Sequence, residues 1–336
     1  MIRRLHFAFL SLFALSALST SHADAQIADV PTAFNEIDVN SRVLNFEAGD
    51  VPVPVGGHWQ GIQMRRDADG DRSQVFLSHD SATTAYIYVV EFSDSLDVPG
   101  RIIHRHEFSS DGDSPPLRHS GGIQLVEDVL VVGVEDNQRK TRSEVQFWEV
   151  SDPTKFRQLT HVTVQRRGEP KAQTAGAVGM VKQGDGHILA VANWDSRAID
   201  FYVSNEKPLL DPECRFTHER QWSAERADIS RWNPGTAFGS HQAIQLLADV
   251  SGTIYLIGFH TDSQDAERAD LFLVDLQQPV ETMLRQVSSR EVTLNDGIHF
   301  RYAAGLWVDQ SKLHFLASER NLQPLTRLMI TGSKSH

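Results

Sequence analysis

Hydrophobic and polar positions repeat along this chain in a fixed order. Each repeat starts with a polar residue, continues through two or three small residues and reaches an apolar one. The five copies of this motif are residues 58–63, 119–124, 174–179, 240–245 and 302–307. They begin about 60 residues apart, a period typical of chains built from repeated supersecondary units. The repeat therefore predicts the organisation of most of the chain.

The residues after each motif also repeat. A polar turn leads into an apolar segment, a polar loop with an acid follows, and a segment with period-two alternation comes next. The apolar segments are 75–77, 129–132, 188–191, 254–257 and 313–316, and the alternating segments are 85–90, 145–150, 199–203, 271–274 and 325–330. A more polar fourth segment closes four repeats, at 102–108, 158–164, 215–222 and 282–292. Helical periodicity is weak, so the pattern predicts β-strands throughout.

Each repeat thus predicts four antiparallel strands, with small residues on the first and growing polarity towards the last. This order is typical of a propeller blade, because inner strands converge on an axis where Gly and Ala allow close backbone approach. Over residues 42–332 the chain resembles the five-bladed β-propellers as a fold group. The resemblance implies an all-β, five-bladed β-propeller of four-stranded antiparallel blades in one domain. A six-bladed ring, with a degenerate blade between Cys214 and Ser240, is the alternative.

The two ends of the repeat region are expected to pair. The fifth repeat has no fourth strand, because His336 follows soon after the strand at 325–330. The segment 42–47 has strand character but belongs to no repeat. We expect it to supply the missing outer strand and to close the ring, which protects the edges that an open sheet exposes.

The first 25 residues have the pattern of a cleavable signal peptide. Arg3 and Arg4 form a basic start, residues 7–18 are apolar, and residues 23–25 read Ala-Asp-Ala, a cleavage signal. The apolar stretch is too short to span a bilayer as a mature helix. We expect a signal peptide over 1–25, a lead segment over 26–41, the propeller over 42–332 and a tail over 333–336. The mature protein is expected in the periplasm or outside the cell.

The net charge limits the kinds of macromolecule that the chain can bind, and the cysteine content limits how the fold can be stabilised. The 336 residues include 32 Lys and Arg against 44 Asp and Glu, which gives a net charge of −12. An acidic chain is unsuited to general nucleic-acid binding, because phosphates require basic surfaces. We therefore expect no nucleic-acid partner, and the composition indicates no transmembrane segment. Cys214 is the one cysteine of this chain, so a large apolar core must stabilise the fold without an intramolecular disulfide.

Polar residues stand at the start of each predicted inner strand and in the loops between second and third strands. The propeller resemblance implies that these two sets share one face, around the mouth of the central channel. Fold does not by itself give function, so each residue must be weighed for its chemistry. The residues expected to bind a ligand there are His58, His119, Asp136, Trp194, Asp195, His241, Asp262 and Tyr302.

Three interpretations of these residues stay open. His58, His119 and His241 could bind one divalent transition metal, because neutral imidazoles from separate strands suit such ions. The ring could instead hydrogen-bond a polar organic ligand, with Trp194 as a stacking face. Alternatively, the histidines and acids only join neighbouring blades and cap turns.

The sequence therefore favours an exported propeller that binds a polar ligand at the channel mouth: a glycan, a small molecule or an envelope protein partner. The alternative is a hydrolase or lyase that is metal-dependent or uses acid/base chemistry in the His/Asp ring. The arabinanase-like glycosidases, a five-bladed group, carry carboxylates at the starts of their inner strands. Here those positions are His, His, Thr, Ser and Tyr, which counts against a paired-carboxylate glycosidase.

One connection, residues 223–239, is unusually long. Long loops in compact domains are commonly functional or mobile. A lid over the channel mouth and a packed surface excursion are both consistent with its sequence.

Overall fold

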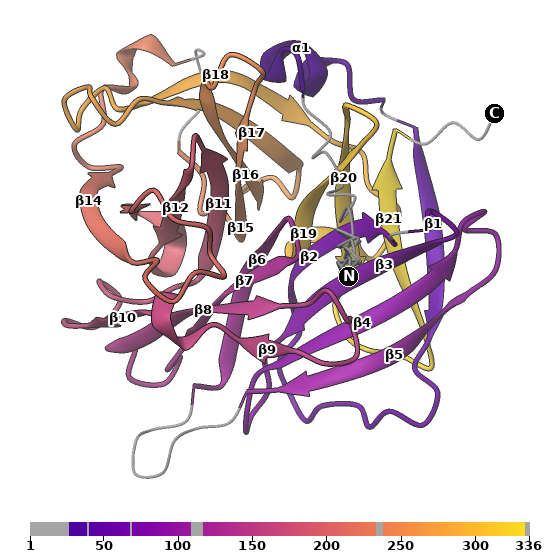
Figure 1. The fold of residues 1–336 in the computed structure, drawn as a ribbon. Helices are drawn as coiled ribbons and strands as arrows, with labels where there is room; N and C mark the ends of the chain where they lie inside the picture. The colour runs from indigo at the N-terminus through magenta and orange to yellow at the C-terminus, as the bar shows by residue number, and fades with distance from the viewer. Residues whose placement is uncertain (1–26, 39, 68, 109–116, 233–237, 333–336) are drawn as a thin grey trace, which may run out of the picture.

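The computed structural model describes residues 27–38, 40–67, 69–108, 117–232 and 238–332. Within these ranges the regular secondary structure is almost entirely β-strand, with one α-helix, α1 (Val30–Asn35) (Figure 1). The expected signal peptide and the C-terminal tail lie outside the described residues. In the described part of the chain, no helix is long and apolar enough to cross a membrane.

Three sheets follow the chain order that the repeats predict, with antiparallel neighbours throughout. The first contains β6 (His119–Val126), β7 (Val129–Glu135), β8 (Arg142–Glu149), β9 (Arg157–Gln158) and β10 (Val164–Arg167). The second contains β11 (Ala177–Gln183), β12 (Gly186–Ala192), β13 (Ala198–Ser204) and β14 (Phe216–Ser223). The third contains β15 (Ala243–Ala248), β16 (Ile254–Thr261), β17 (Glu267–Val274) and β18 (Leu284–Glu291).

The remaining eight strands form one closed sheet. One half is β2 (Trp59–Arg66), β3 (Arg72–His79), β4 (Tyr86–Ser93) and β5 (Gly100–Glu107). The other half is β19 (Ile298–Asp309), β20 (Lys312–Glu319), β21 (Leu325–Thr331) and β1 (Ser41–Glu47). Each half is antiparallel, and short parallel contacts join β19 to β2 and β1 to β5. The closed path therefore consists of two four-stranded antiparallel series that touch at both ends.

The first and last strands of the described fold pair as the sequence predicts. β1 runs antiparallel to β21 from Ser41 opposite Thr331 to Glu47 opposite Leu325. Figure 1 shows the two strands side by side at one edge of the molecule. The terminal segments thus hold each other through backbone hydrogen bonds rather than exposing two free edges.

The fourth strand of the second repeat differs from the prediction. Instead of one strand over 158–164, two short strands flank the 3₁₀ segment η1 (Thr160–Val162). Leu159 and Val162 are both buried in the same apolar cluster. Their spacing of three places them on one side of a 3₁₀ turn but on opposite faces of a strand, so burial of both favours the turn.

The first strands of the four-stranded series lie innermost. β2, β6, β11, β15 and β19 contact one another in that cyclic order, and Figure 1 shows them towards the middle, with β5, β14 and β18 outside. Among the described residues, the buried apolar side chains form five clusters, each between two consecutive series. The apolar core therefore consists of separate clusters, one at each interface between neighbouring series, which we call the seams.

Close approach of the inner strands explains the small residues of the motif. A Cβ atom on Gly305 would lie 1.8 Å from the Ile62 carbonyl oxygen, and one on Gly121 would lie 2.1 Å from the Gly176 carbonyl oxygen. Because any larger side chain would overlap a neighbouring backbone, these positions require glycine.

Three buried glutamines cross the channel between the inner strands. Gln63, Gln124 and Gln245 each occupy the last position of the motif. Gln63 Nε2 donates to Gln245 Oε1 at 2.9 Å, and Gln124 Nε2 donates to the Leu246 carbonyl at 2.7 Å. Five residues along a strand cover about 16 Å, so these contacts lie well below the start of the motif. These hydrogen bonds therefore join inner strands of different blades across the middle of the ring.

Candidate functional site

The channel mouth gathers residues from several strands. His58 precedes β2, His119 begins β6, and His241 precedes β15. Tyr302 lies in β19, and Trp194 lies in the 3₁₀ segment η2 (Trp194–Ser196). The positions expected from the sequence therefore come from the starts of inner strands and from the loops that follow second strands.

His58 lies in a polar network with Asp80. The His58 backbone N–H donates to Asp80 Oδ1 at 2.6 Å, and His58 Nδ1 lies 3.9 Å from the same oxygen. His58 Nδ1 is also 2.7 Å from the Trp59 carbonyl oxygen. The Trp59 carbonyl accepts only from an N–H, whereas the Gln60 amide nitrogen, 2.9 Å from Nδ1, can only donate, so these two contacts require opposite tautomers of His58.

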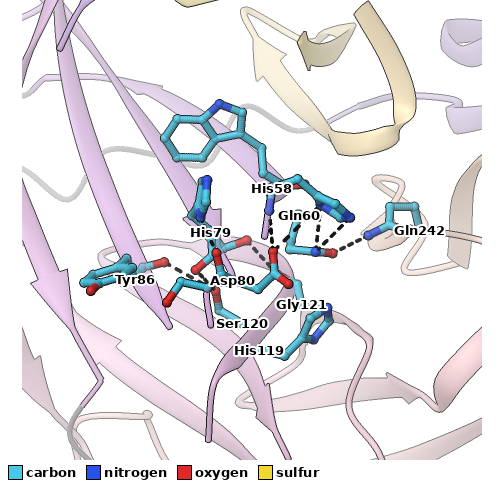
Figure 2. Close-up of polar contacts among 12 residues, drawn as sticks. His58, Gln60, His79, Asp80, Tyr86, His119, Ser120, Gly121 and Gln242 are labelled. Carbon is cyan, nitrogen blue, oxygen red and sulfur yellow. Dashed lines mark hydrogen bonds and ion pairs between the residues drawn. The ribbon is translucent and has the colours of Figure 1, made fainter. Parts of the chain in front are cut away.

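Two glutamine side chains extend this network across the mouth. Gln60 Nε2 lies 2.9 Å from His58 Nδ1, and Gln60 Oε1 accepts a hydrogen bond from Gln242. Figure 2 shows His58, Gln60 and Asp80 joined by dashed contacts, with Gln242 at one end and His119 nearby. The network thus connects the sheet that contains β2 with the segment that leads into β15.

His119 is paired with a buried carboxylate. Its Nδ1 lies 3.2 Å from Glu135 Oε1, and Glu135 is fully buried. The other Glu135 oxygen, Oε2, accepts the Ala175 backbone N–H at 2.6 Å, which fixes the carboxylate. Glu135 lies against the Nδ1 side of the His119 ring as an ion pair without hydrogen-bond geometry, so Nε2 is the nitrogen left for any ligand.

The two histidines have opposite pKa shifts. Burial lowers the pKa of His58 below its ordinary value, although Asp80 offsets part of that effect. Burial also acts to lower the pKa of His119, but Glu135 and Asp80 outweigh it and raise that pKa. Burial acts to raise the pKa of Asp80, but His119 and the His58 N–H lower it overall. The surroundings therefore push the pKa values of His58 and His119 in opposite directions beside one carboxylate.

Aromatic rings border these histidines. The Trp194 ring is half-buried, its centroid lies 5.9 Å from that of His119, and Lys140 Nζ lies 3.3 Å from it. The Tyr302 ring lies 6.0 Å from that of His58 and 5.5 Å from the Arg320 guanidinium. Such rings offer flat apolar faces next to polar groups, which suits stacking against a polar ligand.

Two of the three expected acids have contacts within their own loops. Asp136 accepts the backbone N–H groups of Gln138 and Arg139, both at 3.1 Å. Asp262 accepts from two backbone N–H groups of its own loop and from Arg268 at 2.7 Å. Arg268 and these N–H groups lower the pKa of Asp262 to about 2. Asp195 is exposed, with a left-handed backbone (φ 64°) in η2. Asp136 and Asp262 thus shape their own turns.

His241 belongs to a different group from His58 and His119. Among the described residues, one group of three or more possible metal ligands has all its ligand atoms within 4.8 Å of one another: His241, His260 and Asp270. His241 Nε2 lies 3.1 Å from Asp270 Oδ2, and His260 Nδ1 lies 3.4 Å from the same oxygen. The metal set expected from the sequence, His58, His119 and His241, shares only His241 with this group.

Two aromatic residues of the long connection are packed against neighbouring rings. Trp232 is buried, and its ring lies 6.1 Å from that of Phe238. Phe238 in turn lies 4.6 Å from the rings of both Trp222 and His241. Residues 233–237 lie outside the described ranges. The packing of Trp232 and Phe238 agrees with the packed-excursion interpretation for these two residues.

The structure adds Asp80 and Glu135 to the residues expected from the sequence. Both acids end or directly follow a second strand, and His119 and Glu135 are cross-strand partners on β6 and β7. The acids at these strand ends were a visible signal in the repeat. A bulge in the β6–β7 pairing between Ser120 and Ile123 hid which of them faces His119.

Comparison with known proteins gives a likeness of fold. No protein-family model matches the sequence, and no curated protein matches it. The α-L-arabinofuranosidase from Podospora anserina, solved with cellotriose, is 9% identical, with a TM-score of 0.53 over 89% of this chain and 98% of that one. A GH62 α-L-arabinofuranosidase catalytic domain from Coprinopsis cinerea is 11% identical, with a TM-score of 0.47 over 86% and 97% of the two chains. A GH43_1 enzyme from Xanthomonas citri is 11% identical, with a TM-score of 0.48 over 86% and 94%. The likeness to the Podospora structure supports an all-β propeller fold.

Proposed function

We propose that this protein is an acid/base enzyme, a hydrolase or lyase, that acts on a glycan or similarly polar substrate at the channel mouth. His119 is its proton donor and His58 its proton acceptor. The observation that carries the proposal is the placement of His58 against Asp80 and of His119 against the buried Glu135, which pushes the pKa values of the two histidines in opposite directions. Groups on one site whose surroundings push their pKa values apart are suited to the acid and base roles.

For a hydrolytic reaction the proton transfers balance as follows. The bond between carbon and the leaving oxygen breaks while His119 Nε2 gives its proton to that oxygen. A water molecule adds its hydroxyl to the carbon, and its remaining proton goes to His58 Nε2. Glu135 stabilises the charge of His119 before the transfer, and exchange of protons with solvent restores both imidazoles.

The two carboxylates support the histidines rather than replace them. Asp80 Oδ1 holds the His58 N–H, and Glu135 Oε2 holds the Ala175 N–H. A carboxylate fixed by backbone hydrogen bonds is a positioning group. The site therefore differs from one in which two free carboxylates flank the scissile bond.

A glycan is the substrate class we favour. Trp194 and Tyr302 offer stacking faces, and the half-buried Gln242 offers an amide that matches hydroxyl groups. A cavity of about 270 Å³ lies beside Gly57 and His79, which neighbour His58 and Asp80 in the chain, and its lining does not include the two proposed proton-transfer histidines. The similar fold of an α-L-arabinofuranosidase adds support for this class without fixing the sugar.

We also propose that the ring has five blades and forms one domain over residues 42–332. In this count the eight-stranded closed sheet consists of two blades, one formed by β2–β5 and the other by β19–β21 with β1. The two blades are joined by the short parallel contacts β19–β2 and β1–β5. The cyclic order of five inner strands and the five apolar seams support this count. The N-terminal pattern supports export, and sequencing of the mature N-terminus is its test, with Gln26 expected as the first residue.

The function is tested by a turnover assay with a panel of oligosaccharides that includes arabinose-substituted chains and cellotriose. Wild type is compared with His119→Gln and His58→Gln, each of which removes one titrating group. His187→Gln serves as the control, because His187 is a buried histidine on β12, outside the site. We expect both site variants to lose roughly 100-fold or more in kcat, the usual contribution of one acid or base, and the control to keep its rate. A glycan that binds without turnover would instead make the site a binding module.

A further inference from the structure

His241, His260 and Asp270 form a compact set of metal-type ligands away from the proposed proton-transfer pair. They come from three strands of one sheet: His241 precedes β15, His260 lies near the end of β16, and Asp270 lies in β17. All three are buried, with exposed fractions of 4%, 7% and 2%. Buried charged and imidazole groups need partners, because burial removes the water that would otherwise bind them.

The separations between these atoms suit a small metal ion. Asp270 Oδ2 lies 3.1 Å from His241 Nε2 and 3.4 Å from His260 Nδ1. Two ligands on a tetrahedral zinc ion with bonds of about 2.0–2.1 Å are roughly 3.3 Å apart. These two edges of the tetrahedron are therefore already present, and the two ligating nitrogens lie within 4.8 Å of each other.

One buried nitrogen favours an ion over a purely hydrogen-bonded cluster. His241 Nε2 can donate to Asp270, but His260 Nδ1 has no hydrogen-bond partner despite its burial. A metal at the centre would give His260 Nδ1 a partner. His241 Nδ1 is also buried without a partner and points away from Asp270, so an ion accounts for His260 and not for that second nitrogen.

Glycines hold the two rings in place. A Cβ atom on Gly258 would lie 2.4 Å from His241 Cδ2, and one on Gly239 would lie 2.6 Å from His260 Cε1. The backbone at these positions therefore leaves space that the imidazoles fill. Phe238 packs on the His241 ring at 4.6 Å between centroids, which limits its rotation.

We propose that His241, His260 and Asp270 bind one divalent transition metal, with zinc as the ion that best fits two imidazoles and one carboxylate. Water or a ligand oxygen completes the tetrahedron. This site lies within one sheet, and its loading is separate from the acid/base role of His119 and His58. Its effect on the fold is that of any ligand that binds the native state: it stabilises the protein against unfolding.

The test measures metal and not activity. Protein without a histidine tag is stripped with a chelator, dialysed, and titrated with Zn²⁺, and the bound metal is counted by elemental analysis after desalting. We expect one equivalent in wild type and a rise in melting temperature on loading. His260→Gln and Asp270→Asn should weaken Zn²⁺ binding by more than the roughly 10–100-fold that loss of a residue orienting a ligand costs.

His187→Gln and His58→Gln are the matched controls and should keep one equivalent. Because a change at Asp270 can unfold the sheet, circular dichroism checks each variant. The visible absorption of Co²⁺ bound to wild type provides an independent test of tetrahedral coordination. Absence of stoichiometric metal from wild type, or unchanged binding in His260→Gln, would overturn the proposal. Loss of metal in His58→Gln alone would also overturn it and would place the ion at the channel mouth.

Discussion

His119 on β6 and Glu135 on β7 face each other across one antiparallel strand pair, with 3.2 Å between Nδ1 and Oε1. Because both residues are buried, the carboxylate decides whether the imidazole can hold a proton. The pair therefore connects the register of a β-sheet directly with the proposed chemistry of the channel mouth.

Removal of the Glu135 charge should lower the pKa of His119. In Glu135→Gln the burial of the imidazole remains but its main partner is neutral, so the cationic form loses support. NMR titration of the His119 imidazole measures the change. The control is Glu127→Gln, because Glu127 is exposed in the turn that follows β6, the strand that carries His119. An unchanged His119 pKa in Glu135→Gln would contradict the pairing.

The same pair gives a stability prediction with a defined sign. The folded pKa of His119 is raised, so its contribution is complete below the unfolded pKa of about 6.5 and is lost as pH rises through the folded pKa. The difference in unfolding free energy between wild type and Glu135→Gln should therefore be larger at pH 6 than at pH 9. Urea unfolding at the two pH values measures it, and a larger difference at pH 9 would oppose the assignment.

The proposed activity should have a bell-shaped pH profile. His58 must be neutral and has a lowered pKa, whereas His119 must be protonated and has a raised pKa. The plateau should therefore include pH 6.5, with the acidic limb set by His58 and the basic limb by His119. Residual activity of His58→Gln should lack the acidic limb. A profile with its maximum far above the His119 titration would exclude this assignment of roles.

Acid should destabilise the fold before the carboxylates titrate. Burial lowers the pKa of His79, His106 and His187 to about 4. Between pH 6.5 and 4 the unfolded chain binds more protons than the folded one, so the free energy of unfolding falls as pH falls. For His187 alone the loss is on the order of a few kcal/mol. Urea unfolding of His187→Gln across this range should show a shallower dependence on pH, and an identical slope would count against the prediction.

Pairing of the chain ends should contribute strongly to stability. Phe46 on β1 is fully buried in the seam with β21 and β2, so Phe46→Ala should lower the free energy of unfolding by about 3–5 kcal/mol. Val53→Ala, at a side chain that is 54% exposed, should change it by less than about 0.5 kcal/mol. Equal melting temperatures for the two variants would show that burial of Phe46 between β1 and its neighbours contributes little to stability.

The repeat in the sequence predicts most of the strands and the order in which they follow one another in each series. Small residues in each motif indicated the inner strands, and the lone segment at 42–47 indicated the partner of β21. These features depend on the local residue pattern and on crowding near one axis. The sequence shows the crowded positions as the small residues of each motif. The 3₁₀ turn at Thr160 was not visible, because it depends on which of two faces buries Leu159 and Val162.

The site was only partly accessible from the sequence. His58, His119 and Trp194 do gather near one another, but the prediction chose Asp136 where the structure places Glu135 against His119. A shift of one residue moves a side chain to the other face of a strand, and the bulge on β6 sets that register. Asp270 lies on a third strand, and only tertiary packing brings it to His241.

The most direct test of the proposed function is the comparison of binding and turnover for wild type and His119→Gln on one oligosaccharide. We expect both proteins to bind it with similar affinity and only wild type to cleave it at an appreciable rate. Equal turnover by the two proteins, or binding by wild type without cleavage of any member of the panel, would contradict the claim that the channel mouth performs acid/base catalysis.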